Sequence, residues 1–157
     1  MTDVNRPLVE RFEEAIWETS HSQDVVRVPR EQWREFAEAA KDAGYEMCVD
    51  VTAVDWMRAR PERFEVVASL VSMSHRSRLR MVTTAPREDP EVASLAPVWP
   101  GVGFGEREVF DMFGIRFEGH PDLTRILMPD DWEGYPLRKD HAVGVVPVQF
   151  KRSHQVR

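Results

Sequence analysis

The residues best suited to chemistry are concentrated in one stretch of this 157-residue chain, residues 106–121. Its carboxylates and its histidine suit general acid–base catalysis, with Glu106 and Glu108 as acid and base and His120 as proton shuttle. Residues two apart on a helix point about 200° away from one another, so this pair cannot easily flank one substrate bond. We therefore do not expect a hydrolase. A small free-standing enzyme that uses Glu108, Asp111 and His120 remains an alternative.

The sequence contains few residues that could bind a metal ion or a cofactor. The five histidines include no pair four residues apart, and Cys48 is the single cysteine. One thiolate cannot form an internal disulfide or hold a zinc or iron–sulfur site alone. The glycines at 101, 103 and 105 have the wrong spacing for a dinucleotide-binding loop. We expect this chain to bind no metal and no cofactor, and we interpret Cys48 as a buried or half-buried filler.

Hydrophobic periodicity indicates the elements that must position these residues. Two amphipathic helices are expected, at residues 7–19 and 29–44. A helix cap and nearby prolines predict another short helix between 89 and 97. Alternating or continuously apolar segments predict strands, of which the last three form an antiparallel meander, and residues 64–71 read as a strand covered on both faces. The expected strands are residues 24–28, 45–53, 64–71 and 79–83.

These elements predict an α+β fold, in which helices pack on a mixed, largely antiparallel sheet of about four strands. The length favours a single domain over residues 1–157. We expect its α+β core at 1–104, and a helix followed by a long, extended C-terminal arm at 105–141. A tail at 142–157, basic from Lys151 onward, follows the arm. The arm is too poor in apolar residues to hold itself in place.

The overall composition excludes several classes of partner. With 42% hydrophobic and 31% charged residues, the chain reads as a soluble globular protein. A net charge of −6 argues against nucleic acid, because a surface that follows phosphates needs excess Lys and Arg. No apolar run approaches the roughly 18 residues that cross a bilayer, so membrane contact is expected only through another protein.

The helix expected at 105–113 combines an apolar face with a polar one. Arg107 and Asp111 share the polar face and can pair, and Gly114 is placed to end the helix in a left-handed conformation. A short, capped surface helix would explain this pattern. It would not explain the polar segments that follow, which carry further arginines, carboxylates and turn residues.

A large protein–protein contact accounts for these segments better. Arginines with aromatic residues are typical of interface cores, and fixed Arg–carboxylate pairs discriminate between partners. The expected interface residues are Glu106, Arg107, Glu108, Asp111, His120, Arg125, Arg138, Lys139 and Asp140. The residues expected to shape the backbone are Gly114, Gly119, Pro121, Gly134 and Pro136.

The same residues resemble the signature of the 30 kDa subunit family of NADH-quinone oxidoreductase, which is respiratory complex I. The matching segments are 106–108, Asp111, 113–115, Phe117, 119–121, Leu123, 125–127, 131–134 and 136–140. A weaker likeness extends back to Tyr45.

The resemblance implies a structural subunit without catalytic residues of its own. Such a subunit docks on the large, hydrogenase-like subunit that helps form the quinone pocket, near the iron–sulfur subunits. It is peripheral, on the cytoplasmic side of the cell membrane. FMN, iron–sulfur clusters, NADH and quinone are then expected in other subunits. A related subunit of a membrane-bound nickel–iron hydrogenase or formate hydrogenlyase is the alternative within this fold.

Overall fold

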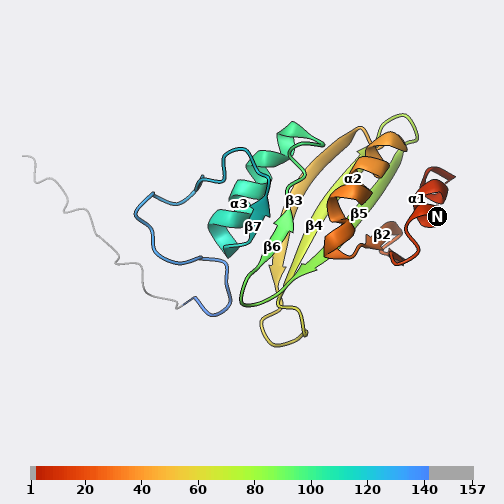
Figure 1. Ribbon diagram of the computed structural model, residues 1–157. Helices are drawn as coiled ribbons and strands as arrows, with labels where there is room; N and C mark the ends of the chain where they lie inside the picture. Colours follow the sequence, from red (N-terminus) through yellow and green to blue (C-terminus); the bar gives the residue numbers. More distant parts are fainter. Residues whose placement is uncertain (1–2, 142–157) are drawn as a thin grey trace, which may run out of the picture.

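The computed structural model describes residues 3–141 and has a mixed five-stranded sheet at its centre (Figure 1). The strand order is β1-β2-β5-β4-β3, and only β2 and β5 pair in parallel within this sheet. The predicted α+β fold with a mixed, largely antiparallel sheet is confirmed, with one strand more than expected. The strands are β1 Ile16–Ser20, β2 Gln23–Arg27, β3 Met47–Asp55, β4 Phe64–Ser72 and β5 Ser77–Ala85.

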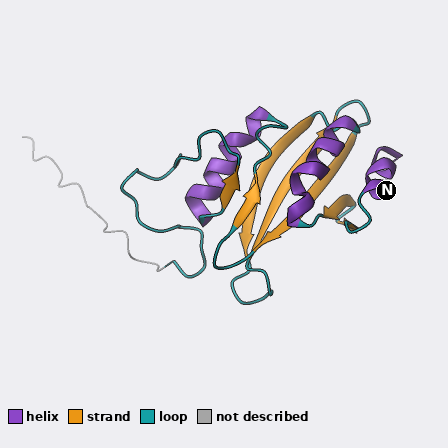
Figure 2. Ribbon diagram, in the orientation of Figure 1, coloured by secondary structure: helices purple, strands orange, loops and turns teal. Residues whose placement is uncertain are grey.

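Three α-helices accompany the sheet in the described part of the chain. Figure 2 draws the helices in purple beside the orange strands. They are α1 Arg6–Arg11, α2 Trp33–Asp42 and α3 Gly103–Phe113. Three 3₁₀ turns are found at Asp3–Asn5, Arg30–Gln32 and Pro100–Val102, the last two of them leading directly into α2 and α3. The apolar face of α2 supplies Trp33, Phe36 and three alanines to the core, as its periodicity predicted.

The meander β3-β4-β5 was predicted correctly, but its central strand is covered less completely than its sequence suggested. In β4, Val66, Ala68 and Leu70 are buried on one face of the sheet, whereas Val67 and Val71 on the other face remain partly exposed. The apolar run therefore reflects one buried face and one half-covered face.

The expected helix at 7–19 is wrong in its second half. Helix α1 ends at Arg11, and the chain continues as strand β1, which pairs antiparallel with β2. Ile16 and Thr19 are β-branched and suit a strand, and the pairing with β2 outweighs the local helical spacing.

The helix expected at 89–97 is also wrong. Residues Glu91–Ala93 form strand β6, which pairs in parallel with β7 at Arg116–Glu118, a segment expected to be irregular. This small sheet joins segments 25 residues apart along the chain, so local sequence signals could not reveal it. It fixes the segment after α3 against the segment before it.

Residues 119–141 form the arm and contain no helix or strand. In Figure 1 the arm runs out beyond α3 and then returns toward the lower ends of β3 and β4. The tail at 142–157, including its basic residues, lies outside the described residues. Within residues 3–141, no helix combines the length and the apolar character needed to span a bilayer.

Candidate functional site

The site is built around helix α3, which lies directly against strand β3. Gly105 allows this approach, because a Cβ there would lie 3.2 Å from the carbonyl oxygen of Val51. Val109, Met112 and Phe113 are buried against the core. The helix ends at Gly114 with φ of 71°, which confirms the predicted left-handed cap. The C-terminal end of α3 is thereby fixed beside the arm.

Asp111 is fully buried and binds the arm. One oxygen of its carboxylate accepts hydrogen bonds from the backbone N–H groups of residues 126, 127 and 128, at 3.1, 2.8 and 2.8 Å. The other oxygen pairs with the Arg125 guanidinium at 2.6 Å. Burial alone would raise the pKa of Asp111, but these donors outweigh it and hold the pKa below its ordinary value. The charged carboxylate therefore fixes four consecutive residues of the arm.

Arg107, one turn earlier on α3, binds the same part of the arm. Its guanidinium donates to the carbonyl oxygens of Thr124 and Arg125, at 3.0 and 2.9 Å. The predicted pairing of Arg107 with Asp111 is therefore wrong, because each side chain reaches the arm instead of its helical neighbour. Together the two residues clamp residues 124–128.

A second contact holds the middle of the arm. The guanidinium of Arg138 donates to the carbonyl oxygen of Phe113, at the end of α3, and lies 4.5 Å from the ring centroid of Tyr135. Arg125 lies over the same ring at 5.5 Å and donates to the carbonyl oxygen of Gly134 at 3.2 Å. The backbone N–H of Leu137 donates to the carbonyl oxygen of Met112 at 3.0 Å. Cation–π stacking and hydrogen bonds to free helix carbonyls thus close the arm onto α3.

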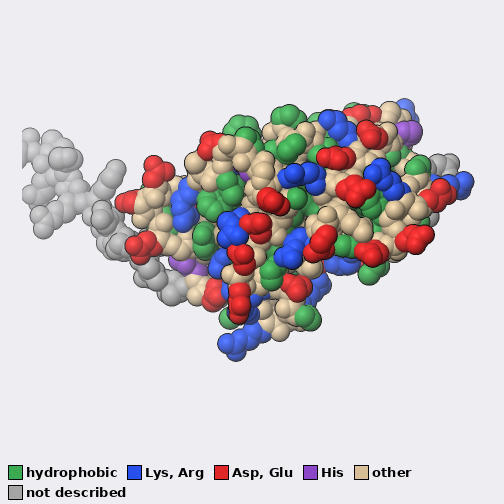
Figure 3. Space-filling view, in the orientation of Figure 1, with side chains coloured by type: hydrophobic (Ala, Val, Ile, Leu, Met, Phe, Trp, Pro, Cys, Tyr) green, Lys and Arg blue, Asp and Glu red, His purple; other side chains and the backbone are tan. Residues whose placement is uncertain are grey.

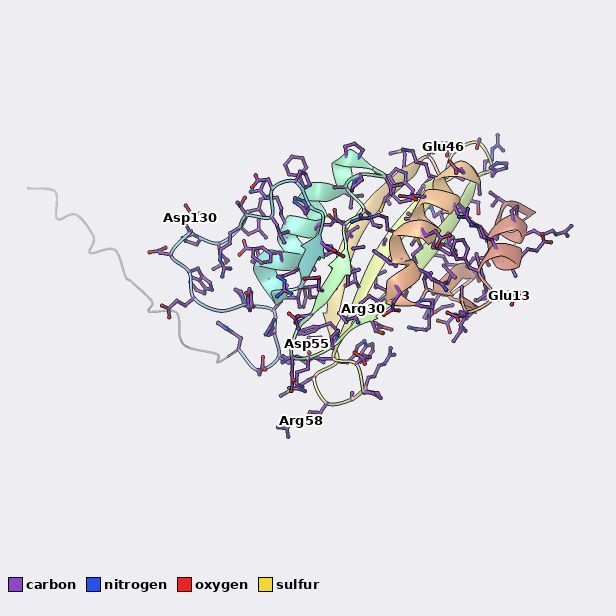
Figure 4. The ribbon with its side chains drawn as sticks, in the orientation of Figure 1. Glu13, Arg30, Glu46, Asp55, Arg58 and Asp130 are labelled. Carbon is purple, nitrogen blue, oxygen red and sulfur yellow. The ribbon has the colours of Figure 1, made fainter. Side chains whose placement is uncertain are left out.

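A third contact fastens the end of the arm to the β3-β4 hairpin. Arg63, with 3% of its side chain exposed, forms ion pairs with Asp55 and Asp140, both at 2.7 Å. The backbone N–H of Lys139 donates to the Asp55 carboxylate at 2.9 Å. Asp55 lies at the base of the hairpin loop that carries Arg58, as Figure 4 shows. Its burial would raise the pKa, yet its hydrogen bonds lower it to about 2.

Glu106 points inward, toward the segment that follows β6. Its carboxylate accepts hydrogen bonds from the Ser94 hydroxyl and the Leu95 N–H, both at 2.6 Å. Burial raises the pKa of Glu106 despite these bonds. The His120 ring lies 3.9 Å from Glu106, contacts the carbonyl oxygen of Gly103 at 3.1 Å, and accepts the N–H of Asp122 at 3.0 Å. Glu106 thus joins α3 to the segment after β6, and His120 joins the start of the arm to the start of α3.

The predicted site residues therefore divide into two groups. The inward group binds this chain's own backbone or buried charges, even where a member such as Asp140 is itself exposed. The side chains of Glu108 and Lys139 are exposed and are not among these contacts. Because Glu106 is buried and Glu108 is exposed, the two do not face a common substrate position. The inward group is Glu106, Arg107, Asp111, His120, Arg125, Arg138 and Asp140.

Sequence reasoning missed Asp55 and used Arg63 only as part of a weak likeness. The sequence did contain a signal for this contact. Asp55 ends β3 and Arg63 precedes β4, and the antiparallel pairing of these two strands brings the two charges together. Nothing local indicated that Asp140, which follows Arg63 by 77 residues, joins this pair.

An apolar cavity of about 390 Å³ opens beside the start of the arm. Phe104, Pro121 and Arg107 contribute to its walls, and the exposed fraction of Phe104 is 66%. Cys48 lies elsewhere, half-buried, and burial raises its thiol pKa to about 12, in agreement with a filler role. Within the described chain, no three His, Cys, Asp or Glu side chains converge in a way that could hold a metal ion.

Fold and site together define an α+β domain in which charged contacts fasten an irregular arm to the end of one helix and to one hairpin. The chain belongs to the family of the respiratory-chain NADH dehydrogenase 30 Kd subunit, whose family model matches residues 26–145. The resemblance noted in the sequence is thereby confirmed.

Curated relatives agree with this family. An NADH-quinone oxidoreductase subunit of Salinispora arenicola is 49% identical over 107 residues, which cover 68% of this chain and 44% of that protein. The corresponding protein of Mycobacterium marinum is 40% identical over 153 residues, covering 94% and 64%. NADH-quinone oxidoreductase subunit 5 of Thermus thermophilus is 40% identical over 139 residues, covering 83% and 67%. The chain thus spans less than half the length of the Salinispora protein.

Solved structures show the same fold. The trypsin-resistant fragment 1–134 of Nqo5 superposes with a TM-score of 0.71 at 36% identity, covering 78% of this chain and all of that one. A chain of the membrane-bound sulfane sulfur reductase, an archaeal respiratory membrane complex, gives a TM-score of 0.80 at 23% identity, covering 99% and 97%. At that identity the second likeness concerns the fold alone.

Proposed function

We propose that this chain is a structural and assembly subunit in the hydrophilic arm of a proton-translocating NADH:quinone oxidoreductase. Membership of the 30 Kd subunit family supports this proposal, as do relatives that are named as subunits of NADH-quinone oxidoreductase. The observation that carries it is the fastened arm: residues 119–141 have no helix or strand, yet buried charges hold them in one shape. Such a shape suits presentation to a neighbour.

In this proposal the charged residues of the site position the arm and do not act on a substrate. Asp111, Arg107 and Arg125 satisfy backbone groups of the arm, and Arg63 neutralises two carboxylates. This chain then supports electron transfer from NADH to quinone by holding other subunits. FMN, iron–sulfur clusters, NADH and quinone would bind to those subunits.

The proposed partner is the large, hydrogenase-like subunit that helps form the quinone site, together with neighbouring iron–sulfur subunits. Glu108 on α3 and Lys139 in the fastened arm are exposed and available for ion pairs with that partner. An obligate contact of this kind buries more than about 2,000 Å². The chain would be peripheral, on the cytoplasmic side of the cell membrane, and would reach the membrane only through the complex.

Affinity purification from solubilised membranes tests this proposal. A tagged wild-type chain is expected to bring down the quinone-site subunit, identified by mass spectrometry, together with NADH:quinone reductase activity. Arg138→Ala should reduce both because the arm is released from α3, and Glu108→Ala should reduce both through loss of a partner contact. Glu13→Ala, a change at an exposed position in the turn that follows α1, is the control.

The possible outcomes separate the competing functions. Normal assembly and activity in both variants would remove the proposed role of the arm and of Glu108. A co-purified large subunit with four nickel-binding cysteines would point to a related hydrogenase complex. A chain that turns over a substrate without any partner would favour the free-standing enzyme and contradict the proposal.

A further inference from the structure

The outer part of the arm holds apolar side chains in solvent. Ile126 is 38% exposed and Leu127 is 60% exposed, although their backbone N–H groups are bound to the buried Asp111 carboxylate. The exposed part of these aliphatic side chains stays in water in the chain by itself, and its burial by another protein would be favourable. The arrangement suits burial by a partner.

The same segment is acidic. Residues 126–137 contain Asp130, Asp131 and Glu133 but no Lys and no Arg. All three carboxylate residues are exposed. Asp130 lies near the outermost part of the arm in Figure 4, and Figure 3 shows acidic side chains along this outer edge.

Nearby arginines do not neutralise this edge from outside. Arg107 and Arg138 direct their guanidinium groups to backbone carbonyl oxygens of the chain itself, and Arg125 pairs with buried Asp111. These three arginines therefore direct their positive charges toward acceptors within the chain. Residues 126–133 thus present exposed aliphatic groups and carboxylates with no Lys or Arg among them, and the exposed Lys139 lies farther along the arm.

We propose that residues 126–133 form a docking surface for a protein subunit whose own contact surface is an apolar depression bordered by Lys and Arg. This inference rests on the proposed function and specifies the chemistry of the partner's surface. Ile126 and Leu127 would fill the depression, and the three carboxylates would face its basic border. Charge complementarity of this kind raises the association rate and rejects wrong partners.

The other classes of partner fit less well. Nucleic acid and anionic membrane surfaces both carry negative charge and are repelled by three carboxylates in four residues. The contacts of Asp111 also fix the backbone before binding, so little ordering cost remains when the partner arrives. A protein partner uses both the charge and the fixed shape.

Site-specific photo-crosslinking within the intact complex tests the inference. A benzoylphenylalanine at position 127 is expected to cross-link to another subunit, at a peptide that contains Lys or Arg. The same probe at position 13, which Figure 4 shows at the other end of the molecule, is the control and should not label that peptide. Cross-links to lipid, to residues 142–157 of the same chain or to a second copy would overturn the proposal, as would their absence.

Charge reversal supplies an independent measurement. Replacing Asp130, Asp131 and Glu133 together by Lys should reduce the amount of complex recovered roughly tenfold, because three favourable pairs become repulsive. The matched control replaces Glu10, Glu13 and Glu38, which are also exposed, by Lys and should leave recovery unchanged. Equal recovery of complex with both triple variants would overturn this inference and would leave the proposed function standing. Failure of the wild-type chain to recover any complex would instead contradict the proposed function.

Discussion

At the scale of single residues, Asp111 has the largest influence on the arm. One carboxylate, without exposed surface, binds three consecutive backbone N–H groups and one guanidinium. Removing one member of such a buried arrangement leaves the others without a charge partner, which is more costly than losing an exposed ion pair.

Asp111→Asn should therefore release the arm while the sheet stays folded. The amide keeps the shape but loses the charge that pairs with Arg125, so we expect the free energy of unfolding to fall by about 2 kcal/mol. Trypsin should cleave after Arg125 faster than in the wild-type protein. Urea denaturation and timed digestion measure the two effects.

Asp122→Asn is the matched control, because Asp122 lies in the arm with an exposed side chain. Its stability and digestion should match the wild-type protein. An Asp111→Asn protein that resists trypsin as well as this control would show that the arm does not depend on the buried carboxylate.

The pKa of Asp55 leads to a prediction for acid stability. Its pKa is about 2 in the folded chain against an ordinary value of 3.8, so the unfolded state binds a proton first as pH falls. The contribution of Asp55 is fully present above pH 4 and is lost between about pH 4 and pH 2. The pKa of Asp140 is lowered as well, in the same direction, through its pair with Arg63.

Asp55→Asn should flatten this part of the stability curve and should lower stability at neutral pH by about 3 kcal/mol, because Arg63 stays buried with one partner fewer. Denaturation midpoints measured from pH 2 to pH 7 check both effects. Asp50→Asn, on the same strand but exposed, should keep the wild-type slope. An unchanged slope in Asp55→Asn would refute the assignment.

Residue types were more predictable than residue pairings. The sequence indicated that Arg107, Asp111, Arg125 and Arg138 belong to one functional region, because arginines, carboxylates and turn residues cluster there. It did not indicate their partners, since these lie in chain that returns from 14 to 25 residues away. Helical spacing alone predicted a pair between Arg107 and Asp111, whereas Arg107 donates to backbone carbonyl oxygens of the arm.

At the scale of elements, the junction between α3 and the arm depends on Gly114. A Cβ there would lie 2.5 Å from the Tyr135 ring and 2.7 Å from the Arg138 guanidinium, in a left-handed backbone conformation. Gly114→Ala should destabilise the protein by about 2 kcal/mol through strain and displacement of these side chains.

Gly101→Ala provides a direct comparison for this variant, because no atom lies within 4 Å of its Cβ position. Thermal unfolding should show a lower midpoint for Gly114→Ala than for Gly101→Ala. If the two variants have the same unfolding midpoint, the close packing of Tyr135 and Arg138 on the helix end does not stabilise the protein.

Elements with strong local periodicity were predicted well, and elements that depend on distant pairing were not. Helix α2 and the β3-β4-β5 meander follow from one apolar face and from alternation. Strands β1 and β6 carry weaker local signals, and each is a strand because a partner lies beside it. The arm is poor in apolar residues, as the sequence indicated, and the contacts that join it to the core are polar ones.

At the scale of the whole molecule, the α+β core is the base to which the arm is fastened, and the proposed function assigns the arm to contact with a partner. Asp111 with Arg107, Arg138, and Arg63 fasten the arm at three places, and His120 adds a contact at its start. We therefore expect the arm to be formed before a partner binds, which is the feature on which the proposed assembly role depends.

Hydrogen exchange at the backbone amides of Ile126, Leu127 and Met128 tests this expectation most directly. In the 157-residue chain without partners, these amides should exchange at least about tenfold more slowly than in an unstructured peptide of the same sequence, and Asp111→Asn should abolish the difference. Exchange at the peptide's rate in the wild-type chain would contradict the preformed arm.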